Sequence, residues 1–356
     1  RAAVGAVQSL AHDLARAVGA QAQDIADVTV CGNTAMQHLL AGWPVAQLGR
    51  APFVAAAAQA LDVAADRLGL ALGPGAAVHL APSIGGFVGG DHVTALLATE
   101  AVWSQPGTTL LMDIGTNTEI SLIHEGRILS ASCPSGPALE GGHIGSGMRA
   151  AEGAIERVEV VDDELRLQVI GGGAPVGLCG SGVLDALAAF VGAGWIDARG
   201  RIVAGRHRCI GEVDGLRAIT LAEEAQERQR QIPAVRLSQH DVRAVQLAKS
   251  AIRTGVRLLC AEAGLEETAI DRLVIAGAFG AYVRVDSARA IGLLPPLPSD
   301  RFNQVGNAAG LGVQQMLTSL GHRARAAAIA REARHVELSS RGDFQKTFLQ
   351  HIGFAP

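Results

Sequence analysis

The sequence has few aromatic residues, a small net charge and no long apolar run. Aromatic side chains make up 3% of the 356 residues, so the core has to be built from aliphatic and alanine side chains. The net charge is −4 and no basic run stands out, which argues against a partner bound through nucleic-acid phosphates, because such binding needs a concentrated positive surface. No stretch approaches the roughly 20 apolar residues that span a bilayer, so we expect no membrane partner.

Cysteines are scarce and unpaired in the sequence. There are five, an odd number, and none forms a CxxC pair. This argues against a disulfide scaffold, a zinc ribbon or an iron–sulfur cluster within the chain, and it predicts a reducing, cytoplasmic location. For Cys179, which lies in a glycine-rich segment, we favour a buried thiol over a reactive one. The cysteines are Cys31, Cys133, Cys179, Cys209 and Cys260.

Apolar residues and glycine are abundant. Apolar residues make up 49% of the chain and charged residues 18%, a composition typical of a large globular core and not of a disordered chain. The length suits two lobes of an intracellular enzyme. We assign residues 1–105 to a first, incomplete lobe, to which 291–356 return, and residues 106–290 to a second lobe. Because the chain begins at Arg1, we interpret it as a piece of a longer protein.

Two segments share one layout of helix, apolar strand and glycine loop. Apolar residues at three- and four-residue spacing predict helices over 2–18 and 241–263. In both segments the glycine that ends the helix lies 13 residues before the glycine of the loop after the strand. These pairs are Gly19 and Gly32, and Gly264 and Gly277. We interpret this as an internal duplication, one copy in each lobe of an α/β protein. The same pattern also occurs in unrelated α/β proteins, and a single matched spacing leaves that alternative open.

The other predicted elements follow from the same periodicities. Residues 198–238 are charged and are interpreted as an irregular surface excursion, and the tail over 306–354 is predicted to be helical, with one strand near Val336–Leu338. Strands are predicted at 108–112, 119–124 and 127–132, and helices at 35–41, 92–100 and 183–191.

A polar turn follows the predicted strand that ends at Met112. Asp113 is followed by Gly115, whose lack of a side chain lets backbone amides approach an anion. Thr116, Asn117 and Thr118 can donate hydrogen bonds to phosphate oxygens. A carboxylate beside phosphate is best used to hold hydrated Mg²⁺ or to orient a water, so Asp113 is our candidate for both catalysis and metal binding. A plain hairpin with a capping aspartate remains the alternative.

This turn is not a P-loop. The sequence contains no GxxxxGK[ST] segment, and its two lysines, Lys249 and Lys346, follow no glycine loop.

Two further glycine loops and one carboxylate complete the candidate nucleotide site. Gly277, Ala278, Phe279 and Gly280 follow an apolar strand, where the backbone can pass close to adenosine, and Gly32 with Asn33 forms the matching loop of the first lobe. Ordinary strand-to-helix turns explain both loops equally well. Asp91 ends a glycine-rich segment and either reaches a metal ion or caps the next helix.

The chain resembles the carboxy-terminal part of ATP-dependent reductive activators of corrinoid proteins, within the acetate and sugar kinase, heat-shock ATPase and actin superfamily (ASKHA). The motifs that carry the resemblance occur in the family's order over nearly the whole chain. They are Val30–His38, Pro82–Asp91, Asp113–Glu119, Ser135–Glu140, Gly145–Met148, Leu178–Gly182, Ile275–Gly280 and Gly306-Asn307.

The resemblance implies an actin-like ATPase fold with duplicated, ribonuclease H-like lobes. It also implies ATP and Mg²⁺ as cofactors and a corrinoid protein or corrinoid-dependent methyltransferase as partner, whose cobalt is reduced from Co(II) to Co(I). A homodimer is a further expectation. The family's electron donor is an amino-terminal [2Fe–2S] ferredoxin domain, whose cysteines this chain lacks. The first lobe's own Asp-Gly-Thr hairpin is absent too, so we expect weak or no hydrolysis and no electron transfer from this chain alone.

Two other functions stay open at this point. A small-molecule kinase of the same superfamily would need a catalytic aspartate beside its substrate, for which Asp91 is the candidate. A non-catalytic module that docks a partner would bind no nucleotide.

Overall fold

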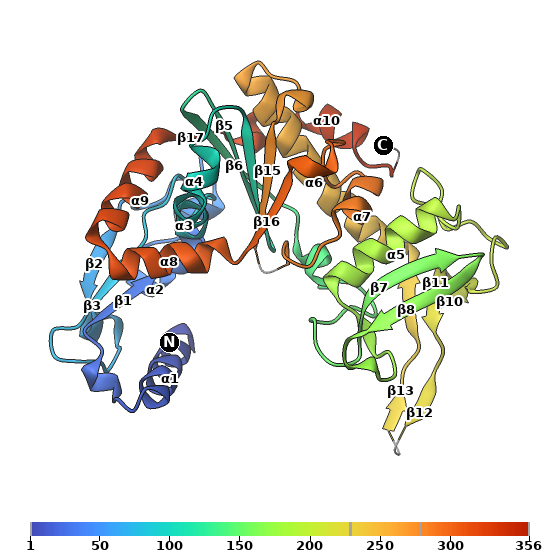
Figure 1. Ribbon diagram of the computed structural model, residues 1–356, viewed down its shortest axis with the longest axis horizontal. Helices are drawn as coiled ribbons and strands as arrows, with labels where there is room; N and C mark the ends of the chain where they lie inside the picture. Colours follow the sequence, from blue (N-terminus) through green and yellow to red (C-terminus); the bar gives the residue numbers. More distant parts are fainter. Residues whose placement is uncertain (1, 228–229, 278, 355–356) are drawn as a thin grey trace. The chain divides into compact units, whose positions relative to one another are not determined.

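The computed structural model describes residues 2–227, 230–277 and 279–354, and the chain divides into two compact units. Unit 1 comprises Arg1–Leu111, Ser121–Ala131 and Asn307–Val336. Unit 2 comprises Met112–Ile120, Ser132–Gly306 and Glu337–Pro356. Figure 1 labels the helices and strands of both units. The lobe boundaries predicted from the sequence, with a change at residue 106, stay a prediction.

A small sheet and a helix open unit 1. The sheet has the order β1-β3-β2, in which β3 (Ala77–Leu80) pairs parallel with β1 (Asp27–Val30) and antiparallel with β2 (Leu61–Ala64). Its core includes the buried residue Val78 on β3, against which Val4 and Val7 of α1 pack. Helix α1 (Ala2–Ala17) confirms the predicted helix.

The apolar stripe of α1 is only partly used in packing. Leu10, Leu14 and Val18, which continue the helical spacing past Val7, are 60%, 68% and 80% exposed. The stripe therefore predicted the helix correctly but did not predict which of its residues are buried.

Four further helices of unit 1 follow strands or loops: α2 (Thr34–Ala41), α3 (Gly90–Ala98), α8 (Ala308–Thr318) and α9 (Leu320–Glu332), with the short α4 (Glu100–Trp103) directly after α3. Helices α3, α8 and α9 pack on one another. The approach of α8 to α3 is close, because a Cβ built on Gly312 would lie 2.1 Å from the carbonyl oxygen of Thr94. A glycine at this position therefore sets the distance between the two helices.

The largest sheet has six strands in the order β16-β15-β4-β5-β6-β17. The division into units falls within β4, β5 and β6. Residues of β4 and β5 are nearly all buried, as expected for strands covered on both faces. The strands are β4 (Thr109–Ile114), β5 (Thr118–His124), β6 (Arg127–Cys133), β15 (Arg272–Ala276), β16 (Phe302–Gly306) and β17 (Ala333–His335). The three predicted strands of the central hairpins are confirmed within two residues at each end.

Unit 2 adds two sheets and a two-stranded ribbon. One sheet has the order β8-β7-β9, from β7 (Ala154–Val161), β8 (Glu164–Val169) and β9 (Gly177–Leu178), and α5 (Gly180–Gly192) packs on β7. The others are built from β10 (Ile210–Val213), β11 (Leu216–Ala222) and β14 (Val235–Ser238), and from β12 (Ala225–Glu227) and β13 (Arg230–Ile232). The prediction that residues 198–238 are irregular is therefore wrong. Although the segment is charged, strand β11 within it contributes buried apolar side chains, those of Ala218, Ile219 and Leu221.

Helix α6 (Gln239–Ala263) is the longest element of unit 2 and has the ends that the sequence predicted. The Ser238 side chain accepts a hydrogen bond from the backbone N–H of Asp241, and the Asp241 carboxylate accepts one from the N–H of Ser238. At the other end Gly264 adopts a left-handed conformation, with φ 71°. Both ends are local capping motifs.

The C-terminal segment docks on α6 through polar contacts that the sequence did not reveal. Gln246 and Lys249 of α6 donate hydrogen bonds to the backbone carbonyls of Ile352 and Gly353. Burial lowers the pKa of Lys249 to about 8, and the nearby Arg253 acts in the same direction. Helix α10 (Phe344–Gln350) packs on α6, and α7 (Val285–Ala290) packs on α5.

The predicted strand at Val336–Leu338 is displaced. The strand lies at Ala333–His335, and Leu338–Ser340 forms a short 3-10 helix instead. Other 3-10 helices are Ala22–Asp24, Ala46–Gly49, Ala65–Leu68, Pro137–Glu140, Ile170–Gly172, Glu267–Ala269 and Ser299–Arg301. No helix in the described ranges is both long and apolar enough to cross a membrane.

His92 of α3 gives unit 1 a specific pH dependence. The side chain is fully buried, its Nε2 lies 2.7 Å from Ser121 Oγ, and burial lowers its pKa to about 3. In the unfolded chain His92 takes up a proton as the pH drops below about 6.5, whereas in the folded chain its imidazole stays neutral at that pH. The free energy of unfolding therefore falls as the pH drops below about 6.5. We expect this residue to account for about 2 kcal/mol of lost unfolding free energy between pH 7 and pH 5.

Urea unfolding at both pH values tests this expectation. His92→Gln should show a smaller loss of unfolding free energy between pH 7 and pH 5 than the unaltered protein. His12→Gln, at an exposed position of α1, is the matched control and should keep the full loss. An unchanged loss in the His92 variant would contradict the assignment.

Candidate functional site

The hairpin between β4 and β5 places the candidate phosphate-binding residues. Strand β4 continues through Asp113 and Ile114, two residues further than predicted, and the turn covers residues 115–117. The backbone N–H of Gly115 donates to the carbonyl oxygen of Asn117 at 3.1 Å. This bond closes the turn, so the N–H groups of the turn that remain for an anion are those after Gly115.

The three polar side chains of this hairpin lie in different surroundings. Thr116 and Asn117 are exposed, whereas Thr118 is fully buried, with its Oγ1 3.0 Å from Ser135 Oγ. The Thr116 hydroxyl donates to Glu140 Oε2 at 2.7 Å. Thr118 therefore ties the hairpin to the segment that begins at Ser135, while Thr116 and Asn117 are the side chains accessible to a ligand.

The loop that begins at Gly277 packs directly against the end of β4. Gly277 has φ 95°, and a Cβ built on it would lie 2.7 Å from the carbonyl oxygen of Ile114 and 2.8 Å from Asp113 Oδ1. Its N–H donates to the carbonyl oxygen of Gly306 at 3.0 Å. Any side chain here would collide with the Ile114 carbonyl oxygen and the Asp113 carboxylate, so this close approach of the loop to β4 requires glycine. Residues far apart in the sequence are thus brought together within unit 2.

The rest of the predicted adenosine loop also packs tightly. Phe279 lies against the first turn of α5, because a Cβ on Gly180 would come within 2.5 Å of the Phe279 ring and 2.0 Å of the Leu139 carbonyl oxygen. A Cβ on Gly280 would lie 2.5 Å from the Ala276 carbonyl oxygen. Ala278, which we also assigned to this loop, lies outside the described residues.

A pocket of about 610 Å³ adjoins the hairpin in unit 2. Glu140 and Arg149 give it charges of both signs. Its glycines are required by packing, since a Cβ on Gly147 would lie 1.9 Å from the Gly141 carbonyl oxygen. The lining residues are Thr116, Pro137, Glu140, Gly141, Gly142, Gly147, Met148 and Arg149.

The loop that forms this pocket is held to α6. Asp241, which caps α6, accepts a hydrogen bond from the N–H of Gly145 at 2.8 Å and is 4% exposed. The capping carboxylate therefore has a second task, which is to fix the glycine-rich loop beside the candidate site.

Sequence reasoning missed several contributors to this region. Neither the hydrogen bond between Glu140 and Thr116 nor the place of Arg149 in the pocket wall was predicted from the sequence. The Glu140 contact joins residues 24 positions apart, which spacing cannot show. The signal that was present is their position, because both directly adjoin glycine-rich motifs. Cys179, by contrast, is confirmed as a buried thiol at 3% exposure.

Gly32, Asn33 and Asp91 meet in unit 1. The Asn33 side chain caps α2 by accepting from the N–H of Met36 at 2.9 Å. The Gly32 carbonyl oxygen accepts from the N–H of Gly90 at 3.0 Å, which holds the start of α3 against this loop. The two glycine-rich motifs of the first 100 residues therefore form one local structure.

Asp91 lies in the first turn of α3. Asp91 is not the N-cap residue of the helix, which is Gly89. The Oδ1 atom of Asp91 instead accepts a hydrogen bond from the N–H of the next residue, His92. Burial raises the pKa of Asp91, against the lowering effect of the N–H groups of His92 and of Asp91 itself. Asp91 and Asp113 belong to different units, so a joint metal site stays a prediction.

The donors available for a metal are few. In residues 2–227, 230–277 and 279–354, no group of three or more His, Cys, Asp or Glu side chains is placed to hold an ion. Mg²⁺ in nucleotide sites is commonly held by one or two carboxylates together with phosphate oxygens and waters. Asp113, a half-buried carboxylate near the end of β4 and next to the polar turn, fits such a role.

Two family models match the chain. One, described as the RACo middle region, matches residues 1–102. The other, described as the C-terminal domain of RACo, the ASKHA domain, matches residues 107–355. The second match confirms the predicted actin-like ASKHA fold.

Individual proteins and one solved structure are similar over long stretches. The corrinoid activation enzyme RamQ of Eubacterium limosum is 35% identical over 343 residues, which is 93% of this chain and 56% of that protein. A [Co(II) methylated amine-specific corrinoid protein] reductase of Methanosarcina barkeri is 30% identical over 236 residues, 60% of this chain and 39% of that protein. The structure of a reductive activator for corrinoid, iron-sulfur protein has 32% identity and a TM-score of 0.89, over 98% of this chain and 56% of that one.

Proposed function

The chain belongs to the RACo family, and on that basis we propose that it is the nucleotide-binding and partner-docking part of an ATP-dependent activator. The activator would return a corrinoid protein, or a corrinoid-dependent methyltransferase, from Co(II) to Co(I). The chain spans 56% of the length of RamQ and of the solved activator. The proposal therefore concerns the whole protein, with the electron supplied by a [2Fe–2S] domain outside this chain.

The observation that carries the proposal is the contact between two loops of unit 2. The Asp113–Thr118 hairpin and the Gly277 loop lie so close that a Cβ on Gly277 would meet Asp113 Oδ1 at 2.8 Å. The hairpin offers backbone N–H groups and the exposed side-chain amide of Asn117 to phosphate, as anion-binding turns do. The exposed Thr116 would have to release Glu140 before its hydroxyl could donate to phosphate. The Gly277–Gly280 loop would border adenosine.

Each residue has a defined task in this proposal. Asp113 would hold Mg²⁺, which when bound neutralises phosphate charge, and would orient the attacking water. Glu140 Oε2 accepts a hydrogen bond from the Thr116 hydroxyl. This bond directs the oxygen lone pairs of Thr116 away from the carboxylate and fixes the side-chain rotamer. Gly32 and Asn33, together with Asp91, stay candidate contacts from unit 1.

Nucleotide binding would act on the partner through differential affinity. Reducing Co(II) is thermodynamically uphill for ordinary cellular donors, so ATP has to favour the reducible form of the complex. A nucleotide can shift that equilibrium only by the difference between its affinities for the two states. The cytoplasmic location predicted from the cysteines and the predicted homodimer both stay predictions.

A spectroscopic titration of the full-length protein tests the proposal. The protein is mixed with a Co(II) corrinoid partner and a chemical reductant, and the Co(I) absorption is followed with and without Mg²⁺ and ATP. We expect Co(I) to accumulate with ATP and not with ADP. Equal Co(I) formation without nucleotide would contradict the ATP-dependent role, and nucleotide-independent binding of the partner would favour a docking module.

A further inference from the structure

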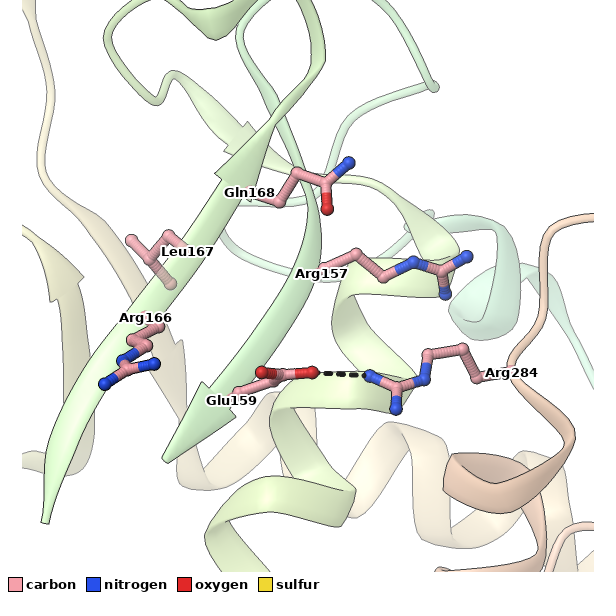
Figure 2. Close-up of a pocket in the computed structure, with 6 residues that line it drawn as sticks. All are labelled: Arg157, Glu159, Arg166, Leu167, Gln168 and Arg284. Carbon is pink, nitrogen blue, oxygen red and sulfur yellow. Dashed lines mark hydrogen bonds and ion pairs between the residues drawn. The ribbon is translucent and has the colours of Figure 1, made fainter. Parts of the chain in front are cut away.

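A second pocket of unit 2 lies on the β7–β8 hairpin and shares no lining residue with the candidate functional site. Its volume is about 340 Å³, near the lower end of the range of small-molecule sites. Figure 2 shows Arg284, from the segment before α7, extending toward Glu159 on β7. The lining residues are Arg157, Glu159, Arg166, Leu167, Gln168 and Arg284.

A buried carboxylate holds two of the three arginines in this pocket. Asp185 on α5 is 2% exposed, and its Oδ2 lies 3.6 Å from Arg157 Nη1 and 3.7 Å from Arg284 Nη1. Burial raises the pKa of Asp185, while Ser287 and the two arginines oppose that shift. A buried carboxylate needs such partners, so both guanidinium groups are drawn to one place beneath the pocket.

The ion pairs leave hydrogen-bond donors unused. Arg284 Nη1 also meets Glu159 Oε1 at 3.0 Å, and Arg157 Nη1 meets the Tyr282 carbonyl oxygen at 3.5 Å. In the described part of the chain, the Nη2 atoms of these two arginines donate no hydrogen bond, and Arg166 makes no hydrogen bond or ion pair through its guanidinium group. Each planar guanidinium presents paired N–H groups that match phosphate and carboxylate oxygens.

The charge of the lining residues favours an anion. Three arginines line the pocket with a single carboxylate, that of Glu159. The carboxylates of Asp185 and of Glu156, which accepts a hydrogen bond from Gln168 Nε2 at 2.9 Å, balance the arginines without lining the pocket. Asp185 lies beneath the pocket and does not line it, so the surface that a ligand would contact is more positive than the whole cluster. The amide of Gln168 adds a neutral polar group at the same wall.

We propose that this pocket binds a small organic anion through a terminal phosphate or carboxylate group. The arginines are pre-positioned by Asp185 and Glu159, so ligand binding orders few additional side chains and the entropic cost is reduced. The site is separate from the proposed nucleotide site and does not depend on the proposed function.

Calorimetric titration of the full-length protein with pyrophosphate and with citrate tests the proposal. Nucleotide is left out, because ADP carries a terminal phosphate and would compete for this pocket. Ionic strength is matched with NaCl, and the Arg166 variant distinguishes this pocket from the proposed nucleotide site. We expect saturable binding of at least one probe, weakened about tenfold by Arg166→Gln, since one charge-assisted contact is lost. Arg166 is exposed and makes no contact that folding needs, so this variant should fold normally.

Arg243→Gln is the matched control, because Arg243 is an exposed arginine on α6 outside the pocket. It should leave the affinity for both probes unchanged. Absence of saturable binding by either probe, or equal weakening in the two variants, would overturn the proposal. Arg166-dependent binding of an acidic peptide without binding of either small anion would overturn it too, and would identify a protein-docking surface instead.

Discussion

Replacing Asp113 by asparagine is expected to lower ATP turnover of the full-length protein about 100-fold or more. Asparagine keeps the size of the side chain but removes the negative charge that would hold Mg²⁺ and orient the attacking water. The residue lies near the end of β4, where the Gly277 loop packs against its carboxylate. Steady-state ATPase measurements, with far-UV circular dichroism to verify folding, test this expectation.

The same variant separates binding from chemistry. If Asp113 acts mainly on the reacting phosphate, kcat should fall far more than nucleotide affinity. Asp300→Asn is the control, because Asp300 is an exposed aspartate in a short 3-10 helix of the same unit. Full ATPase activity in the Asp113 variant would refute its assignment as the catalytic and metal-binding residue. That result would not count against the separate proposal that the β7–β8 pocket binds an anion.

Replacing Glu267 by alanine is expected to lower the free energy of unfolding by about 3–5 kcal/mol. Glu267 Oε2 accepts a hydrogen bond from Arg253 Nη2 at 2.8 Å, and their side chains are 9% and 7% exposed. Removing the carboxylate leaves the guanidinium of Arg253 buried in α6 without a counter-charge. Chemical denaturation followed by circular dichroism measures the effect.

The neighbouring residue supplies a control for this stability prediction. Glu266 also pairs with an arginine, Arg257, but its side chain is 79% exposed and the distance is 3.4 Å. Glu266→Ala should therefore cost about 1 kcal/mol or less. Replacing Arg253 and Glu267 together by apolar residues of similar size should recover most of the lost stability. Equal effects of the two alanine variants would contradict the account.

Local motifs in the sequence predicted their structures well. The helix over 241–263, its stop at Gly264 and the strand that leads into Asp113 were all placed within two residues. Each depends on hydrogen bonds or backbone angles within a few residues, so their residue types are sufficient. Segment 198–238 was misjudged because β11 does not alternate buried and exposed positions regularly, and because β14, which does alternate, is only four residues long.

In the candidate site, too, the sequence predicted the local motifs but not the contacts between distant segments. Glycine and polar residue types indicated the hairpin and the Gly277 loop, but not that Thr118 is buried or that Thr116 binds Glu140. Nor did they indicate how close Gly277 comes to Asp113.

The sequence by itself determined the family and the ASKHA fold, because motif order and local backbone requirements are written in neighbouring residues. The anion-binding residues that it suggested stay a prediction. The tertiary structure alone decided which loops meet, which polar side chains are buried, and that Asp185 gathers Arg157 and Arg284 beneath a pocket. Some of these contacts join residues far apart in the sequence. Asp113 and Gly277, for example, are 164 positions apart. Such distances are closed by packing, and no local pattern specifies them.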